Sequence, residues 1–143
     1  MSRIKITLPE TFAFSTHIPI RIGDINYGNH VGNDAVLSII HEARMQFFFQ
    51  HSYTELDCGG VGLIMYDAGI EFKKELFYGD TLQVSVQASN FTQTGFDLFY
   101  KLEKKENGKS IIAAVAKTGM LCYNYDLKKI AFMPAALKEK LTG

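Results

Sequence analysis

The stretch from residue 33 to about residue 51 limits the possible folds of this chain more than any other part of it. Apolar side chains occupy almost every position, and His41, Glu42 and Arg44 are the main interruptions. A helix that is apolar nearly all round is expected to be buried on most faces. With 143 residues, the chain has room for one such core. The sequence therefore predicts one domain, residues 1–143, built around this helix.

The start of this helix carries polar residues with a defined spacing. Asn33 is a good N-cap, and Asp34 in the first turn complements the positive end of the helix dipole. Asp34, Ser38 and Glu42 are spaced i, i+4 and i+8, so they form one polar stripe. Such a stripe on an otherwise apolar helix either faces a solvated groove or has a function.

The remaining segments alternate as β-strands do. Period-two patterns and the Asn107-Gly108 turn predict strands joined by hairpins, and hence an antiparallel sheet that packs against the helix. A single sheet cannot cover an all-apolar helix, so a second copy of the chain is expected to cover its flanks. The predicted strands are residues 12–22, 63–72, 81–91, 96–103 and 110–125, and a short closing helix spans residues 134–141.

Composition and charge exclude several classes of protein. Lys+Arg and Asp+Glu both number 15, so no overall field attracts nucleic acid or an anionic membrane. The two cysteines, Cys58 and Cys122, have neither metal-site nor disulfide-framework spacing. No secretory signal and no membrane-spanning run is found. A cytoplasmic protein is the expectation, without metal, nucleic-acid or membrane partners.

The loop at residues 23–32 is the expected place for chemistry. It combines three glycines with the turn-forming residues Asp24, Asn26 and Asn29, and it holds one histidine, His30. It leads directly into the apolar helix, whose first backbone N–H groups lack partners within the helix. A loop of this kind can present backbone and side-chain donors to a ligand.

These motifs resemble those of the hot-dog-fold thioesterases that are similar to 4-hydroxybenzoyl-CoA thioesterase. That family reads R-x-G-D-x-D-x-x-G-H-V-N-N followed by a helix with E-A-R. The later pieces Gly79-Asp80-Thr81-Leu82-Gln83-Val84 and Met133-Pro134 also fit the family. The matching motif positions are Arg21, Gly23, Asp24, His30, Val31, Asn33, Leu37, Glu42, Ala43 and Arg44.

The resemblance implies an α+β hot-dog fold, in which an antiparallel β-sheet is wrapped around one long central helix. It implies hydrolysis of an acyl-CoA thioester to a free acid and CoA. It also implies a homodimer or homotetramer with the site at the dimer interface. No cofactor or metal is expected, because CoA is part of the substrate.

The motif departs from the family pattern in two places, and one of them matters for catalysis. The family glycine before the histidine is moved, since Gly28-Asn29-His30 stands where the family has x-Gly-His. The aspartate that the family uses in catalysis falls on Asn26, and an amide cannot act as nucleophile or general base. The missing carboxylate is therefore sought elsewhere. Asp34, at the helix start, is the first candidate and Glu42, two turns further on, the second. The alternatives are a solvent-exposed helix-dipole aspartate and a buried, hydrogen-bonded glutamate.

The other site residues receive roles from the same reasoning. Backbone N–H groups from Gly32 to Asp34 are expected to hold the thioester oxygen, unless Asn33 caps them. Asn26 and His30 are expected to position substrate or water, with turn geometry and structural hydrogen bonding as alternatives. Asp24 either belongs to the binding site or bonds nearby backbone in an Asx-turn.

An acyl pocket and a CoA-binding surface are also expected. Tyr27 and Tyr66 are assigned to the acyl pocket; aromatic residues of the helix, Phe47 and Phe48, either join them or belong to the core. The remaining candidates are lysines that either meet the phosphates of CoA or are solvated: Lys73, Lys74, Lys104 and Lys105.

Two other functions remain open. A hot-dog hydratase or dehydratase uses an Asp/His pair, and Asp24-Ile25-Asn26 followed by His30 partly matches its motif. The change from aspartate to Asn26 equally fits an acyl-CoA-binding module that has lost catalysis. Cys58 lacks a neighbouring base and is not expected to be a nucleophile.

Overall fold

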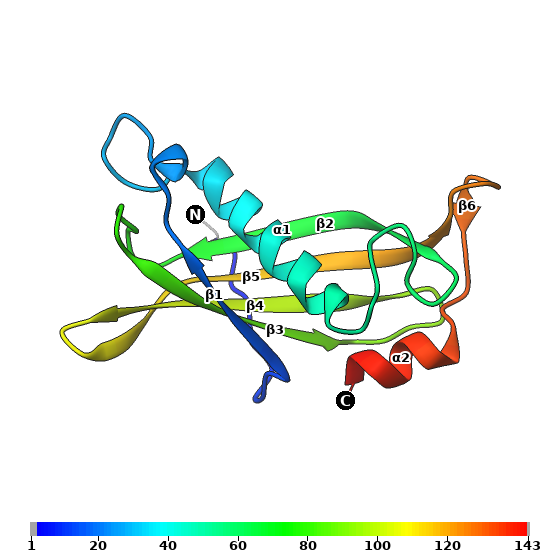
Figure 1. Cartoon of the computed structure of the whole chain (residues 1–143). Coiled ribbons are helices and arrows are strands. Elements are labelled where there is room, and N and C mark those ends of the chain that lie inside the picture. The colour runs from blue at the N-terminus through cyan, green and yellow to red at the C-terminus, as the bar shows by residue number, and fades with distance from the viewer. Residues whose placement is uncertain (1–2, 143) are drawn as a thin grey trace.

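The computed structural model describes residues 3–142, and its architecture is a sheet with one long helix across it (Figure 1). The predicted helix and strands are present with boundaries shifted by a few residues, and a 3-10 turn, η1, and a short strand, β6, are additional. Among the helices of residues 3–142, none is long and apolar enough to cross a membrane. The elements are β1 (Phe14–Pro19), η1 (Ile22–Asp24), α1 (Asn33–Phe49), β2 (Gly62–Phe72), β3 (Thr81–Ser89), β4 (Gly95–Glu106), β5 (Lys109–Asn124), β6 (Lys129–Ile130) and α2 (Ala135–Thr142).

The strands form one antiparallel sheet in the order β1-β3-β4-β5-β2, with β6 paired to β5. The prediction that successive strands are all joined by hairpins is wrong for β2. This strand does not pair with β3, which follows it in sequence, but with β5 at the other side of the sheet. β5 is an inner strand. β2 is the last strand, so within residues 3–142 one of its edges has no strand partner.

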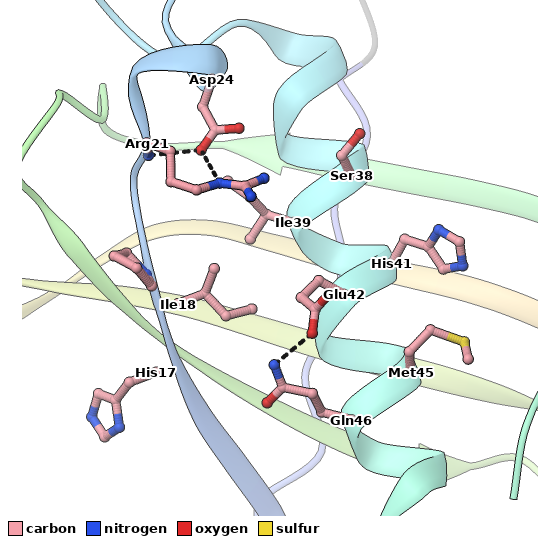
Figure 2. A pocket seen from close by; sticks show the side chains of 11 residues that line it. His17, Ile18, Arg21, Asp24, Ser38, Ile39, His41, Glu42, Met45 and Gln46 are labelled. Atoms are coloured by element: carbon pink, nitrogen blue, oxygen red, sulfur yellow. Dashed lines mark hydrogen bonds and ion pairs between the residues drawn. The ribbon is translucent and has the colours of Figure 1, made fainter.

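Helix α1 lies across one face of the sheet (Figure 1) and packs on β1 and β3. Within the single chain it is buried on one face only, and burial of its flanks by a second copy stays a prediction. Leu37 and Phe49 are 45% and 76% exposed. A groove between β1 and α1 is left open on one flank (Figure 2). The buried residues of α1 are Val36, Ile39, Ile40, Ala43, Arg44, Phe47 and Phe48.

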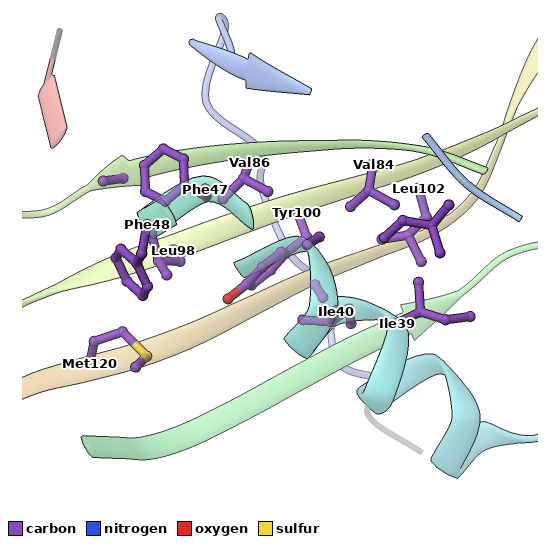
Figure 3. Packing of buried hydrophobic residues seen from close by; sticks show 14 of the residues in the cluster. Ile39, Ile40, Phe47, Phe48, Val84, Val86, Leu98, Tyr100, Leu102 and Met120 are labelled. Carbon is purple, nitrogen blue, oxygen red and sulfur yellow. The ribbon is translucent and has the colours of Figure 1, made fainter. Parts of the chain in front are cut away.

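The core lies between α1 and the sheet. Figure 3 shows Phe47 and Phe48 of the helix in one cluster with Val86, Leu98 and Met120 of the strands. Fully burying an aromatic or aliphatic side chain of this size contributes about 1.5–3 kcal/mol to folding. This packing fixes the position and direction of α1, and therefore the place where its first turn begins.

Candidate active site

The connection between β1 and α1 is held by Asp24, which is buried although it is charged. Its Oδ2 accepts the backbone N–H of Arg21 at 2.9 Å and lies 3.9 Å from the Arg21 Nε. Its backbone oxygen accepts the N–H of Gly32 at 3.2 Å. Asp24 is thus hydrogen-bonded within the turn, as the Asx-turn alternative predicted, and it joins the 3-10 turn to the first residue before the helix.

The tip of the loop is closed by backbone pairing between Ile25 and Val31. Inside it, the Asn26 N–H donates to the His30 oxygen at 3.0 Å, and the Asn26 Oδ1 accepts the N–H of Gly28 at 2.8 Å. The Asn26 Nδ2 faces Gly32, 3.7 Å from the point that a Cβ on Gly32 would occupy. The amide therefore both shapes the turn and directs its NH2 group toward the helix start.

The start of α1 has no side-chain cap. Gly32, not the predicted Asn33, is the N-cap residue, and no side chain of residues 3–142 bonds to its first turn. The first hydrogen bond of the helix is Val36 N–H to the Gly32 oxygen, at 3.2 Å. The N–H groups of Asn33, Asp34 and Ala35 precede that bond and remain free to donate. The helix dipole places partial positive charge at the same point.

The Asp34 carboxylate lies against this helix start. Its Oδ1 is 2.7 Å from the position that a Cβ on Gly32 would take, so the close approach depends on the glycine. The carboxylate is exposed to solvent and therefore accessible to a ligand. The structure brings Asp34, Asn26, Gly32 and Asn33 together, as the sequence predicted.

His30 and Asn33 face a cavity of about 240 Å³ on the β2 side of α1. The His30 Nδ1 lies 3.2 Å from the Val31 oxygen, which holds the ring in place. The other wall comes from the end of β2, the segment after it and β5. The remaining lining residues are Val31, Val36, Phe72, Lys73, Lys74, Glu75, Leu76, Ala113 and Ala114.

Glu42 is not part of this constellation. It is exposed, lies in the groove of about 420 Å³ between β1 and α1 (Figure 2), and its Oε2 accepts the Gln46 Nε2 at 2.6 Å. The helical rotation of 100° per residue puts Glu42 on the flank of α1 opposite Asn33. The expected burial of Glu42 is therefore wrong, and its assignment as a catalytic base stays a prediction that its position beside β1 does not support.

The two tyrosines assigned to the acyl pocket do not line it. Tyr27 is fully exposed at the loop tip. The Tyr66 ring lies 2.6 Å from the point where a Cβ on Gly119 would be, and the Lys117 Nζ is 5.6 Å from its centroid. Since Thr118 is buried toward α1, its neighbours on β5 point to the other face of the sheet. Tyr66 thus lies away from the helix, while Phe47 and Phe48 belong to the core.

A buried arginine on α1 is a feature that sequence reasoning treated only as part of a motif. The Arg44 Nη1 donates to the Tyr100 hydroxyl at 3.3 Å, and that hydroxyl lies 2.8 Å from the Thr118 Oγ1. Burial raises the pKa of Tyr100, so its hydroxyl stays neutral. In the sequence, the buried position of Arg44 is indicated by its place within a run of apolar helical residues.

Other reactive or charged groups are engaged elsewhere. Burial raises the pKa of the Cys58 thiol to about 12, and its Sγ donates to the Thr54 oxygen at 2.8 Å, so it cannot serve as a nucleophile near neutral pH. The Lys104 Nζ is buried and donates to the Glu75 oxygen at 2.9 Å. It is therefore not available to a phosphate, whereas Lys73 and Lys74 border the cavity beside His30.

Comparison with known proteins gives a consistent result. The family described as the thioesterase-like superfamily matches residues 20–141. A 1,4-dihydroxy-2-naphthoyl-CoA hydrolase from Microcystis aeruginosa is 31% identical over 109 residues, covering 74% of this chain and 76% of that protein.

Solved structures share the fold at lower identity. A 1,4-dihydroxy-2-naphthoyl-CoA thioesterase from Synechocystis superposes with a TM-score of 0.79 at 20% identity, covering 90% of this chain and 94% of the other. A mutant 4-hydroxybenzoyl-CoA thioesterase in complex with 4-hydroxybenzoyl-CoA gives a TM-score of 0.80 at 14% identity, covering 90% and 98%. The predicted hot-dog fold, an antiparallel sheet with one long helix, is confirmed.

Proposed function

This chain belongs to the thioesterase-like superfamily, and from that premise we propose that it hydrolyses the thioester bond of an acyl-CoA at the start of α1. The observation that carries the proposal is the uncapped first turn of α1 next to a carboxylate. The N–H groups of Asn33 and Asp34 have no helical acceptor, and the Asp34 Oδ1 lies close to Gly32.

The thioester oxygen accepts hydrogen bonds from the N–H groups of Asn33 and Asp34. These donors are fixed by the helix, and they strengthen as negative charge develops on the oxygen in the transition state. Removing a single such donor in other acyl-transfer enzymes costs about 2.7–4 kcal/mol of transition-state stabilisation. Because the helix amides polarise the carbonyl, the reaction needs neither a metal ion nor a cofactor.

Asp34 acts as the general base. It accepts a proton from a water molecule, and the water oxygen attacks the thioester carbon to form a tetrahedral intermediate. The C–S bond then breaks, the CoA thiolate leaves and takes up a proton, and the free acid remains. Asn26 donates its free NH2 group to the water or the substrate, and His30 lines the cavity beside them.

The active form is a homodimer in which the β2 edges of two copies pair. A long strand with an unpaired edge favours pairing with another chain. Large apolar side chains flank the same side of α1, and they are partly exposed in the single chain. Those residues are Leu37 at 45%, Met65 at 46% and Phe72 at 44% exposed. Pairing there places the helix start and its cavity at the interface; two such dimers then form the tetramer.

Replacing Ala68 with proline tests this assembly. In an antiparallel sheet, the backbone N–H groups of a strand point alternately to its two sides. The Lys73 N–H donates to the Ala113 oxygen of β5, so the N–H of Ala68, five residues earlier, points to the free edge of β2. Proline removes an N–H from that edge. We expect Ala68→Pro to shift the protein from dimer to monomer in light scattering after size exclusion, whereas Ala68→Val stays dimeric. Two copies that remain paired in the proline variant would contradict β2 pairing.

The hydrolytic function itself is tested with purified protein and a panel of aromatic and aliphatic acyl-CoAs. Hydrolysis releases a free thiol, which a thiol reagent detects. A loss of enoyl absorbance without thiol release would instead indicate a hydratase. An increase in melting temperature with acyl-CoA but no turnover would indicate a binding module, and either outcome would overturn the proposal.

Replacing Gly32 with alanine tests the geometry of the site. Gly32 has φ −73, which alanine adopts readily, but the added Cβ would lie 2.7 Å from the Asp34 Oδ1 and displace it. We expect kcat/KM to fall roughly 100-fold, as for a catalytic group moved by about 1 Å, with little change in melting temperature. Gly23→Ala is the control, because nothing lies within 4 Å of a Cβ at that position. Equal activity of both variants would exclude the role given to Asp34.

A further inference from the structure

One stripe of α1 runs along its β2 side, from the helix start to a buried cation. Asn33, Leu37, Ile40 and Arg44 are separated by four, three and four residues, so they share one side of the helix. The cavity beside His30 contains Asn33 at its helix wall. A second cavity, of about 260 Å³, contains Leu37, Ile40 and Arg44. The two cavities are therefore consecutive along the same flank.

The wall opposite the helix is also shared. Phe72 and Ala114 border the first cavity and are direct partners across β2 and β5. Met65 of β2 and Thr118 of β5 border the second cavity. The same two strands run alongside α1, so the two cavities follow one another from the free N–H groups toward Arg44, and we call this flank with its two cavities the groove. Leu37, Met65 and Phe72 of this flank belong to the surface that pairing of two copies covers, so the groove lies at the proposed dimer interface.

Arg44 at the end of this groove is incompletely satisfied. Its side chain is only 7% exposed. A guanidinium has five N–H donors, and burying it without acceptors is costly. The hydrogen bond to the Tyr100 hydroxyl is long, at 3.3 Å. Nε lies 3.7 Å from the Glu55 Oε1, outside hydrogen-bond range, and has no acceptor within residues 3–142.

Glu55 determines which charge fits beside Arg44. Its Oε1 is 2.8 Å from the His41 Nε2, and it balances much of the Arg44 charge at 3.7 Å. A second carboxylate would face this carboxylate in a confined space. A neutral hydroxyl or carbonyl oxygen can accept a hydrogen bond from the Arg44 guanidinium without that repulsion.

We propose that the second cavity binds the end of the acyl group remote from the thioester, and that Arg44 recognises a hydroxyl or carbonyl oxygen there. This assignment rests on the proposed function, which places the thioester carbon at the helix start. Ten residues of helix separate Asp34 from Arg44, a rise of about 15 Å. Arginine side chains on a helix reach back toward its start. The groove therefore suits an acyl group that extends from the thioester carbon at the helix start to the Arg44 guanidinium and bears the oxygen at its far end.

The test compares two thioesters that differ only in that oxygen, 6-hydroxy-2-naphthoyl-CoA and 2-naphthoyl-CoA. The measured quantity is the ratio of their kcat/KM values. We expect a ratio of at least tenfold in favour of the hydroxylated thioester in the wild type, and a ratio near one in Arg44→Met. Met45→Leu, on the opposite flank of α1, should keep the wild-type ratio. A wild-type ratio near one, or an unchanged ratio in Arg44→Met, would overturn the proposal.

A second variant and a binding readout keep the result interpretable. If Arg44→Met does not fold, Arg44→Lys preserves the charge but not the fork of donors, and it should reduce the ratio at least threefold. If neither thioester is hydrolysed, the panel of acyl-CoAs decides whether the proposed function fails. Recognition by Arg44 is then measured separately, by calorimetric titration with the two free naphthoic acids. Equal affinities for these acids would overturn the role of Arg44.

Discussion

Replacing Asp34 with asparagine is expected to lower kcat/KM for an acyl-CoA about 100- to 10,000-fold, the usual contribution of a general base. The two side chains have nearly the same size and shape, and Asp34 is exposed, so the fold and the helix start should be preserved. Asparagine cannot accept the proton of the attacking water. The expected loss is therefore in kcat, with KM changed much less, and initial rates of thiol release measure it.

Glu42→Gln is the matched control. It also replaces a carboxylate on α1 by an amide, but on the flank that faces β1, where Glu42 bonds Gln46. We expect its kcat/KM to stay within about twofold of wild type, as for surface substitutions away from the chemistry. A large loss in Glu42→Gln with little change in Asp34→Asn would place the base in the β1 groove. Full activity in both variants would mean that neither carboxylate takes part in the mechanism.

The second large effect concerns folding. Phe48→Ala is expected to lower the free energy of unfolding by about 3–5 kcal/mol, because it removes a fully buried ring and leaves a cavity between α1 and the sheet. Phe48 is 0% exposed and packs against Phe47 at 5.6 Å between ring centroids (Figure 3). Urea unfolding, followed at matched protein concentrations, measures the change.

The neighbouring residue supplies the control for that experiment. Phe49 is 76% exposed, so Phe49→Ala should change stability by less than about 0.5 kcal/mol. Both variants lose the same ring from the same helix, so propensity effects cancel. Similar losses in the two variants would mean that Phe49 is covered in the assembled protein and that the single chain understates its burial.

The strands and α1 could be predicted from sequence because their patterns are local. The alternation in residues 81–89 and the apolar run of α1 each specify an element. The position of β2 could not be predicted in this way. Alternation says which face of a strand is buried, but not which strand lies beside it. The pairing of β2 with β5 depends on the segment from Lys73 to Asp80, which carries the chain to the other side of the sheet.

Tyr66 shows how one irregularity defeats the same logic. The register of β2 shifts between Met65 and Asp67, and Tyr66 is the extra residue at that bulge. A bulge redirects side chains relative to simple alternation. Nothing in the local sequence marks it, so the assignment of Tyr66 to the acyl pocket could not be corrected without the structure.

The site was predicted in part. Asn26, Gly32, Asn33 and Asp34 do meet, because the loop and the helix start are adjacent in sequence and the motif fixes their spacing. The cap was assigned to the wrong residue, since capping preference favours Asn33 while the bond from the Gly32 N–H to Asp24 fixes the helix start one residue earlier. Glu42 was expected to be buried because its neighbours on α1 are apolar, but its flank of the helix faces the open groove beside β1.

The bonds that close the loop between β1 and α1 also bear on how tightly a substrate is held. Asp24 to Gly32, Asn26 to His30, and Val31 to Leu76 are all joined through backbone hydrogen bonds before any ligand arrives. The conformational entropy of this segment is thus lost once, during folding, and not again at each encounter. Contacts made by an incoming molecule can then appear almost fully as affinity, without an ordering penalty from the loop.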